Sequence, residues 1–382
     1  MENNPVIVVG GNHHNTLGVI RSLGEKGILS DAIIMTPEEK PYVSLSKYIN
    51  SCKIVQTEQQ VLDELYAYKA DRKPVVIACA DALSSLLDCH YNDLSERFFL
   101  PGSKKQGDIT RLMDKEVMTE LASDIGFCIP QSSSVDTKDK NKKIDIPLPW
   151  IIKPLVSKNG QKADIERIYS EEEWANYCER HDSTVQVQQL IDKELEYQLI
   201  GLSLNDGNET IIPGLSDVIR PAATTNTGFL HYIPLDESYQ QVLEKGKIFL
   251  KETGYSGLFS LEFLRGKDGN DYFMEINFRN DGNAICVTAA GFNLPYIWYL
   301  YQTGGDYRNE INKNKLKSVY VMPEFTDLVY VLRGQLNIFT WLKDIHRTDR
   351  FMEYDKNDKQ PFYHLLKEFV NCGIKKIERK IM

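Results

Sequence analysis

The chain lacks the patterns of a disulfide-stabilised or zinc-binding protein. Its seven cysteines are an odd number, and they form no Cys-x-x-Cys pair and no four-ligand set with histidine. We therefore expect free thiols in a reducing compartment, which favours a cytoplasmic location.

Long apolar runs and excess positive charge are also missing. The richest apolar segment, residues 292–301, is interrupted by Asn293 and Pro295 and is shorter than the roughly 18 residues of a membrane span. The first residues are acidic and polar, so we expect no secretory signal. A net charge of −9 disfavours nucleic acid and anionic membranes as partners. An anionic ligand must then be held by a few local cations.

Glycine and proline are not in excess, which excludes collagen-like and disordered chains. The 382 residues include 24 glycines and 15 prolines, and 42% of the chain is hydrophobic. A chain of this length predicts a folded protein of two or three domains with a substantial core.

The first hundred residues show a repeated strand-helix pattern. A β-branched run at 6–9 is broken by Gly10-Gly11, and Leu17, Ile20 and Leu23 follow at helical spacing before the next apolar run at 33–35. Residues 75–79 begin a second such unit, so we predict a parallel sheet covered by helices. The first turn lacks the Gly-x-Gly-x-x-Gly order of dinucleotide-binding domains, which disfavours a dehydrogenase. His13 and His14 lie in this turn and either face a substrate cleft or, the favoured interpretation, belong to a surface loop.

The rest of the chain predicts mixed helices and antiparallel strands. A helix is expected from Asp114 to Ala122, and another begins after Ser170. Strands are expected at 150–153, 185–190, 196–204, 258–264 and 272–277, and Asp268-Gly269 predicts a hairpin turn between the last two.

Two acids and an amide are predicted to meet on this hairpin. Strand alternation places Glu275 and Asn277 on one face, and the hairpin can bring Glu262 beside them. Such an oxygen-only set suits Mg²⁺ that carries phosphate oxygens. The alternative is a pair of solvated acids, but their apolar neighbours argue against it, because burying like charges together is costly without a cation.

Three cations could hold an anionic ligand. The Arg279 guanidinium could bind a substrate carboxylate or a phosphoryl group in a planar fork, and the alternative is a surface ion pair with Asp281. Lys115 begins a helix, and Lys153 ends an apolar strand, where a lysine is unexpected unless it meets an anion. Taken singly, each lysine is better explained by a side chain that reaches from the core to solvent.

In their order along the chain, these elements resemble the ATP-grasp superfamily of ligases. The resemblance runs over about residues 100–305 through Asp114-Lys115, Trp150-Ile-Ile-Lys153-Pro154, Gln188-Gln-Leu-Ile191, Glu196, Phe259-Ser-Leu-Glu262 and Glu275-Ile-Asn277-Phe-Arg279. Gln188-Gln189 stand where the family commonly has an acid and a lysine. Leu17–Gly27, Arg220-Pro221 and Thr227-Gly228 are similar to carboxylate-amine ligases such as D-aspartate ligase.

The resemblance implies an α/β and α+β fold in four parts. These are a Rossmann-like pre-ATP-grasp domain (1–105), the small lid subdomain (106–187), the large subdomain with the metal site (188–310) and a C-terminal extension (311–382).

The same resemblance implies site residues and substrates. ATP would be bound by Lys115, Lys153, Ser157, Gly160, Lys162, Gln188, Gln189, Leu190, Ile191 and Glu196, with Glu194 an alternative to Glu196 at the ribose. One or two Mg²⁺ ions, or Mn²⁺, would be held by Glu262, Glu275 and Asn277. Arg279 and Arg220 would act on the substrate.

The implied activity is ATP-dependent joining of a carboxylate to an amine through an acyl phosphate. The carboxylate would be a small molecule or sugar-linked, the amine an amino acid, and the protein a homodimer. Two alternatives stay open: an ATP-binding regulatory module without turnover, and a kinase that releases the phosphorylated carboxylate.

Overall fold

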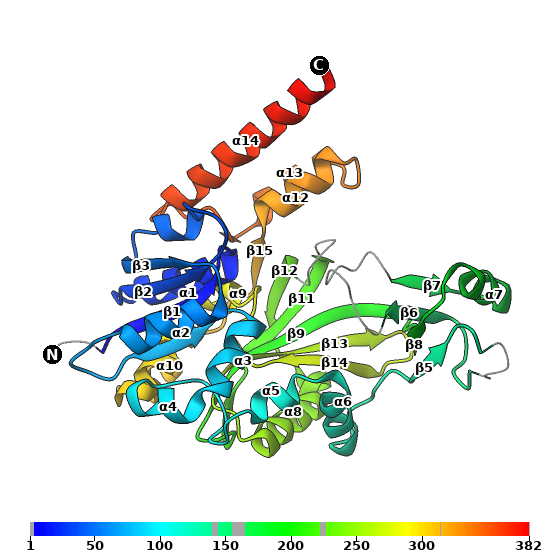
Figure 1. Cartoon of the computed structure of the whole chain (residues 1–382), viewed down its shortest axis with the longest axis horizontal. Coiled ribbons are helices and arrows are strands. Elements are labelled where there is room, and N and C mark those ends of the chain that lie inside the picture. The colour runs from blue at the N-terminus through cyan, green and yellow to red at the C-terminus, as the bar shows by residue number, and fades with distance from the viewer. Residues whose placement is uncertain (1–3, 140–143, 155–164, 222–226, 314, 382) are drawn as a thin grey trace.

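The computed structural model describes residues 4–139, 144–154, 165–221, 227–313 and 315–381. Within these residues, no helix combines the length and the apolar character needed to cross a membrane. Figure 1 shows the N-terminal domain at one end, long central strands, and a small subdomain at the other end.

The N-terminal domain has the predicted parallel sheet. Its strands lie in the order β3 (Ile49–Val55), β2 (Ser30–Met35), β1 (Val6–Gly11), β4 (Val75–Ala78). The accompanying helices are α1 (His14–Gly24), α2 (Glu58–Ala67), α3 (Asp81–Cys89) and α4 (Tyr91–Arg97), with a 3₁₀ turn at Tyr42–Leu45. The sequence did not predict β3, because this edge strand is mostly exposed and lacks a continuous apolar run.

The small subdomain is an antiparallel sheet with a helix. Its strands lie in the order β5 (Ser132–Asp136), β8 (Thr184–Gln189), β6 (Trp150–Pro154), β7 (Glu166–Ile168). Helix α7 (Glu171–Arg180) starts where predicted, because the Ser170 side chain accepts from the Glu173 amide. Two short helices, α5 (Asp108–Leu112) and α6 (Lys115–Asp124), connect this part to the N-terminal domain. The predicted boundary after residue 187 falls inside β8.

The large sheet forms the centre of the molecule. Its order is β14 (Asp271–Asn277), β13 (Gly257–Gly266), β9 (Lys193–Leu204), β11 (Gly214–Pro221), β12 (Gly228–Pro234), β15 (Val319–Met322), β16 (Arg350–Phe351), and β10 (Glu209–Ile211) pairs with β9. Neighbouring strands are antiparallel except β15 with β16. A 3₁₀ turn (Glu237–Tyr239) leads into helix α8 (Gln240–Thr253), which packs against the sheet through Phe249 and Leu250.

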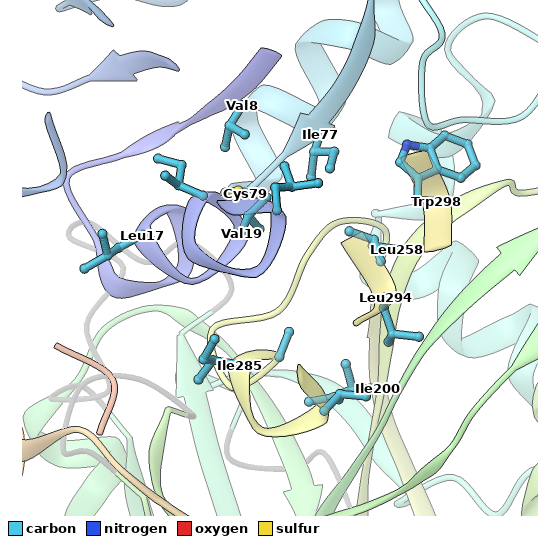
Figure 2. Packing of buried hydrophobic residues seen from close by; sticks show 14 of the residues in the cluster. Val8, Leu17, Val19, Ile77, Cys79, Ile200, Leu258, Ile285, Leu294 and Trp298 are labelled. Atoms are coloured by element: carbon cyan, nitrogen blue, oxygen red, sulfur yellow. The ribbon is translucent and has the colours of Figure 1, made fainter. Parts of the chain in front are cut away.

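The apolar core of the N-terminal domain continues into the large sheet. Helices α9 (Ile285–Ala289) and α10 (Leu294–Thr303) lie between them, followed by α11 (Tyr307–Lys313). One buried cluster contains Val8 and Ile77 of the N-terminal sheet together with Ile200, Leu258 and Trp298 (Figure 2). The carboxyl ends of β1 and β4 are therefore held at a fixed place beside β13 and β14.

The last segment extends the large sheet and then forms helices. Strands β15 and β16 add to the edge beyond β12, and the predicted boundary at 310 falls inside α11. Helices α12 (Glu324–Leu332), α13 (Ile338–Arg347) and α14 (Gln360–Ile381) lie together at one end of the molecule (Figure 1). Phe325 of α12 packs on Phe362 and Phe369 of α14.

Candidate active site

A cleft of about 980 Å³ opens between the small sheet and the large sheet. Its walls come from α6, β6 and β8 on one side and from β9, β13 and β14 on the other. Six residues that the sequence predicted line this one cleft: Lys115, Lys153, Gln188, Glu196, Glu262 and Glu275. Strand and helix geometry thus brings together side chains that are up to 160 positions apart in the sequence.

The two lysines occupy positions that the local structure fixes. Asp114 caps α6, with its Oδ1 accepting from the amides of Glu116 (2.9 Å) and Val117 (3.2 Å), so Lys115 is the first helical residue. Lys153 donates from Nζ to Gln188 Oε1 at 2.7 Å. Burial and the charge of Lys115 lower the pKa of Lys153, which Glu275 partly offsets. Two ammonium groups facing one cleft favour a polyanionic ligand.

The predicted hinge divides between two cavities. Gln188 lines the main cleft, whereas Gln189, Leu190 and Ile191 line a neighbouring cavity of about 210 Å³ beside the Gly266–Asp268 turn. The amides of Gln189 and Leu190 donate to Gln131 O and Pro149 O, which fixes the course of the chain between β8 and β9.

The alternatives at the predicted ribose position are separated by the structure. Glu196 lines the main cleft, and Lys193 Nζ donates to its Oε2 at 2.7 Å. Glu194 is exposed and is not among the residues that line the cleft. Of the two acids, Glu196 is the one placed to contact a ligand there.

The β13–β14 hairpin brings Glu262 directly opposite Glu275. Gln198 Nε2 and Asn277 Nδ2 each donate to Glu262 Oε1 at 3.0 Å, and the Glu262 and Asn277 residues are both only 8% exposed. The interpretation of Glu262 as a solvated surface acid is therefore wrong. Burial raises the pKa of Glu262 well above its ordinary value, and the charges of Glu275 and Asp281 raise it further.

This donor set fits a divalent cation that is shared with a phosphate ligand. Glu262 and Glu275 offer carboxylate oxygens, whereas Asn277 directs its Nδ2 toward Glu262 and its Oδ1 accepts from Arg279 Nη2. In the described part of the chain, no group of three or more His, Cys, Asp or Glu side chains could hold a metal alone. Mg²⁺ commonly binds through one or two carboxylates and takes its remaining ligands from water and phosphates.

A second cavity of about 280 Å³ adjoins the cleft through the same two glutamates. The N-terminal domain contributes residues that follow β1 and β4, and the large subdomain contributes strand and loop residues. The lining residues are His13, Asn15, Cys79, Ala80, Asp81, Gln198, Thr227, Glu262, Glu275, Arg279, Asp281 and Gly282. A molecule bound here would lie beside the carboxylates that border the main cleft.

Arg279 lines this second cavity and is mostly buried. Its guanidinium pairs with both Asp81 oxygens, at 2.9 and 3.2 Å, and Nη1 lies 3.4 Å from Asp281 Oδ2. The ion pair with Asp281 that the sequence offered as an alternative is present, yet the side chain still faces the cavity.

The last predicted residues are Arg220 and the three residues of the predicted lid. Arg220 binds Asp327 and Asp344 of the C-terminal helices, and it lines neither the main cleft nor the second cavity. Ser157, Gly160 and Lys162, the predicted lid, lie outside the described residues.

Sequence reasoning missed Asp81 and misplaced His14. Asp81 follows β4, and ligands of α/β sheets bind at the carboxyl ends of strands, so its position was a usable signal. The surface-loop interpretation is wrong for His14, whose side chain is only 10% exposed and whose Nδ1 lies 3.5 Å from Glu353 Oε1. Burial lowers the pKa of His14 to about 4. His13 is exposed but lines the second cavity.

Comparison with known proteins gives one related sequence and many related structures. No family model matches the chain. An alignment over 205 residues, which covers 50% of this chain and 37% of the relative, shows 24% identity to the C-terminal section of the carbamoyl phosphate synthase large chain of Aquifex aeolicus.

Three solved structures illustrate the shared fold. L-amino acid ligase from Bacillus licheniformis has a TM-score of 0.56 and 14% identity, and the match covers 78% of this chain and 73% of that one. N5-carboxyaminoimidazole synthetase from Staphylococcus aureus with ADP has a TM-score of 0.61 and 15% identity, with 80% of this chain and 79% of that one covered. Biotin carboxylase from Campylobacter jejuni with an ATP analogue has a TM-score of 0.62 and 14% identity, with 82% of this chain and 74% of that one covered. The predicted fold is confirmed: the chain has an α/β domain followed by the ATP-grasp fold that these structures share.

Proposed function

We propose that this chain is an ATP-dependent ligase that joins a carboxylate to an amine. The observation that carries the proposal is the convergence of Lys115 and Lys153 with Glu262 and Glu275 on one cleft, beside a second cavity that contains Arg279. The related proteins support it, since their names include an amino acid ligase, a synthetase complexed with ADP and a carboxylase complexed with an ATP analogue.

In the proposed reaction, an oxygen of the substrate carboxylate attacks the γ-phosphorus of ATP. The bond from that phosphorus to the β,γ-bridging oxygen breaks, and ADP leaves. The amine nitrogen then attacks the acyl carbon of the acyl phosphate, the bond from carbon to the phosphate oxygen breaks, and the nitrogen loses a proton. Positioning and charge stabilisation supply most of the catalysis in phosphoryl transfer.

The residues of this chain have separate roles in the proposal. Lys115 and Lys153 bind the α- and β-phosphates, and Glu196 binds the ribose. Glu262, Glu275 and Asn277 would hold Mg²⁺ or Mn²⁺, which neutralises phosphate charge when bound. Arg279 orients the substrate carboxylate by donating to its oxygens.

The finer assignments are also proposals. We infer that the carboxylate is a small molecule or sugar-linked acid, that the amine is an amino acid, and that the subtype is similar to D-aspartate ligase. The cavity of about 280 Å³ beside Arg279 suits one small polar group rather than a large apolar one. A cytoplasmic location is consistent with consumption of ATP and with a cysteine pattern that predicts no disulfide framework.

The test is a matrix of carboxylic acids and amines incubated with the purified chain, ATP and Mg²⁺, with ADP, phosphate and amide measured. We expect ADP release that depends on both substrates, and a loss of about 100-fold or more in Glu275→Gln, the scale of losing a preorganised charge-stabilising group. Glu194→Gln, an exposed acid on β9, is the matched control and should keep its activity.

Two outcomes would contradict the ligase, and a third would remove one assigned residue from it. ADP formation without amine identifies a carboxylate kinase, and ATP binding with no ADP under any substrate pair identifies a regulatory module. Wild-type turnover in Glu275→Gln removes that residue from the mechanism.

A further inference from the structure

Every N–H donor of Arg279 already has a partner within the protein. An arginine side chain has five such donors. Nε and Nη2 donate to the two Asp81 oxygens at 2.9 and 3.2 Å, and Nη2 also donates to Asn277 Oδ1 at 3.1 Å. Nη1 donates to Asn280 O at 3.2 Å and to Asp281 Oδ2 at 3.4 Å. A substrate anion can bind this guanidinium only by displacing one of these groups.

Asp81 is the partner that can leave at the lowest cost. Its side chain is 58% exposed, whereas the side chains of Arg279 and Asp281 are 15% and 6% exposed. A rotation of the Asp81 side chain returns its carboxylate to water, so no charge is left buried without a partner. Asp281 cannot leave in this way, because it also accepts from Ser260 Oγ at 2.9 Å and from the Asn283 amide at 2.8 Å.

The backbone on both sides of the Asp81–Arg279 pair is pinned. The Asn280 amide donates to Ala78 O at 3.1 Å, and Ser84 Oγ donates to Phe278 O at 2.6 Å. Asn15 Nδ2 bridges Cys79 O (2.9 Å) and Asn280 O (2.8 Å). The two segments therefore stay in register, and opening of the ion pair requires only side-chain rotation.

The position that Asp81 vacates is suited to another anion. It lies in the second cavity, next to Glu262 and Glu275 and hence next to the main cleft. Asp81 is the first residue of α3, whose N-cap, Ala80, offers no side-chain acceptor to the first amides. A helix N-terminus favours negative charge, and so does the planar fork of Arg279.

We propose that Asp81 is an internal substitute for the substrate anion: its carboxylate occupies the Arg279 fork in the free protein and is displaced by a carboxylate or phosphoryl oxyanion that binds there. This inference rests on the proposed function only in naming that anion as part of the substrate. The displacement makes Arg279 available to a ligand that can outcompete Asp81, and stray anions bind weakly because they must break the ion pair first.

The experiment measures the affinity of two simple anions, acetate and inorganic phosphate, for the full chain with saturating MgADP in the main cleft. Titrations followed by ¹³C and ³¹P NMR compare the wild type with Asp81→Asn and Asp93→Asn. Asp93 is the matched control, because it is an exposed acid in the first turn of the neighbouring helix α4. The same titrations are repeated in an Arg279→Lys background, which keeps the charge but loses the fork. They test whether any gain in anion affinity needs the guanidinium.

We expect Asp81→Asn to tighten binding of at least one anion about tenfold. This is the change expected if the Asp81–Arg279 ion pair is open in about a tenth of the wild-type molecules, because the apparent affinity is reduced by that fraction. Asp93→Asn should stay within about twofold, and the gain should vanish with Arg279→Lys. The anion with the larger gain identifies the group that uses the fork. An unchanged or weaker affinity in Asp81→Asn overturns the inference, as does an equal gain in Asp93→Asn or a gain that persists with Arg279→Lys.

Failure of the proposed function would be seen separately. Calorimetry of MgADP binding and the assay for ADP release report on the ligase, whereas the comparison between anion affinities needs no turnover. If Arg279→Lys does not fold, as judged by circular dichroism, Asp81→Asn against Asp93→Asn still decides the matter.

Discussion

Glu262→Gln should make the metal-free protein more stable and, under the proposed function, inactive. Glu262 Oε1 accepts two hydrogen bonds, from Gln198 and Asn277, and a glutamine oxygen can accept both. The substitution removes a buried charge that faces Glu275 across the hairpin. The desolvation cost and the like-charge repulsion disappear, while the packing is kept.

The size of the gain follows from the stability of functional sites in general. Single stabilising substitutions commonly add about 0.5–2 kcal/mol to the free energy of unfolding, and we expect the removal of this buried charge to fall in that range. A chain of 382 residues has an unfolding entropy of about 0.8 kcal/mol/K, so the midpoint should rise by about 0.6–2.5 °C. Differential scanning fluorimetry at several pH values, with EDTA and then with Mg²⁺, resolves a change of this size.

The pH dependence has a definite sign. Because the folded-state pKa of Glu262 is raised, the wild type loses stability as the pH rises from the ordinary glutamate pKa through the folded-state pKa. The advantage of Glu262→Gln should therefore be largest above that folded-state pKa and disappear at acidic pH. Mg²⁺ should stabilise the wild type and the control Glu194→Gln, but not Glu262→Gln. A variant that melts below the wild type in EDTA at alkaline pH, or that responds to Mg²⁺ as the wild type does, refutes this reasoning.

Three further predictions concern the lysine, the ribose acid and the C-terminal ion pair. Lys153→Met should weaken ATP binding about 10- to 100-fold in calorimetry through loss of a charged contact, and Lys251→Met, at an exposed position, is the control. Because the pKa of Lys153 is lowered in the free protein, ATP binding should also take up protons at alkaline pH. This uptake would be seen as a binding enthalpy that depends on the buffer, and Lys153→Met should abolish it. Glu196→Gln should weaken ATP binding about tenfold while Glu194→Gln leaves it unchanged, and equal effects of the two would contradict the placement of Glu196 in the cleft. Arg220→Met should cost about 3–5 kcal/mol of unfolding free energy in denaturant titrations, because it leaves Asp327 buried without its ion-pair partner and leaves Asp344 with Arg347 alone. ATP affinity should stay within about twofold, and a stable variant with impaired turnover would restore Arg220 to the substrate site.

The parts of the site that lie on local elements could be predicted from the sequence. Alternation along a strand and a tight turn fix how Glu262 and Glu275 face each other, because only a few residues separate the two strands. Capping by Asp114 fixes the start of α6, and the apolar run before Lys153 fixes a strand. The ordered series of such elements also predicted the fold.

Elements without a strong local pattern were missed. Strands β11 and β12 mix buried and exposed positions, and they acquire their pairing from β9 and β15 on either side. Arg220 belongs to β11, and its guanidinium meets acids more than 100 residues later, so its sequence neighbours could not reveal that partner.

The sequence by itself determined the fold and the chemical identity of the main cleft, because those depend on periodicity, turns and residue types within short segments. Only the tertiary structure decided the second cavity. Asp81 and Arg279 are 198 residues apart, and they meet because the N-terminal sheet and the large sheet share one apolar core. That packing is non-directional and spread over many side chains, so no short segment specifies which carboxylate will occupy the arginine fork.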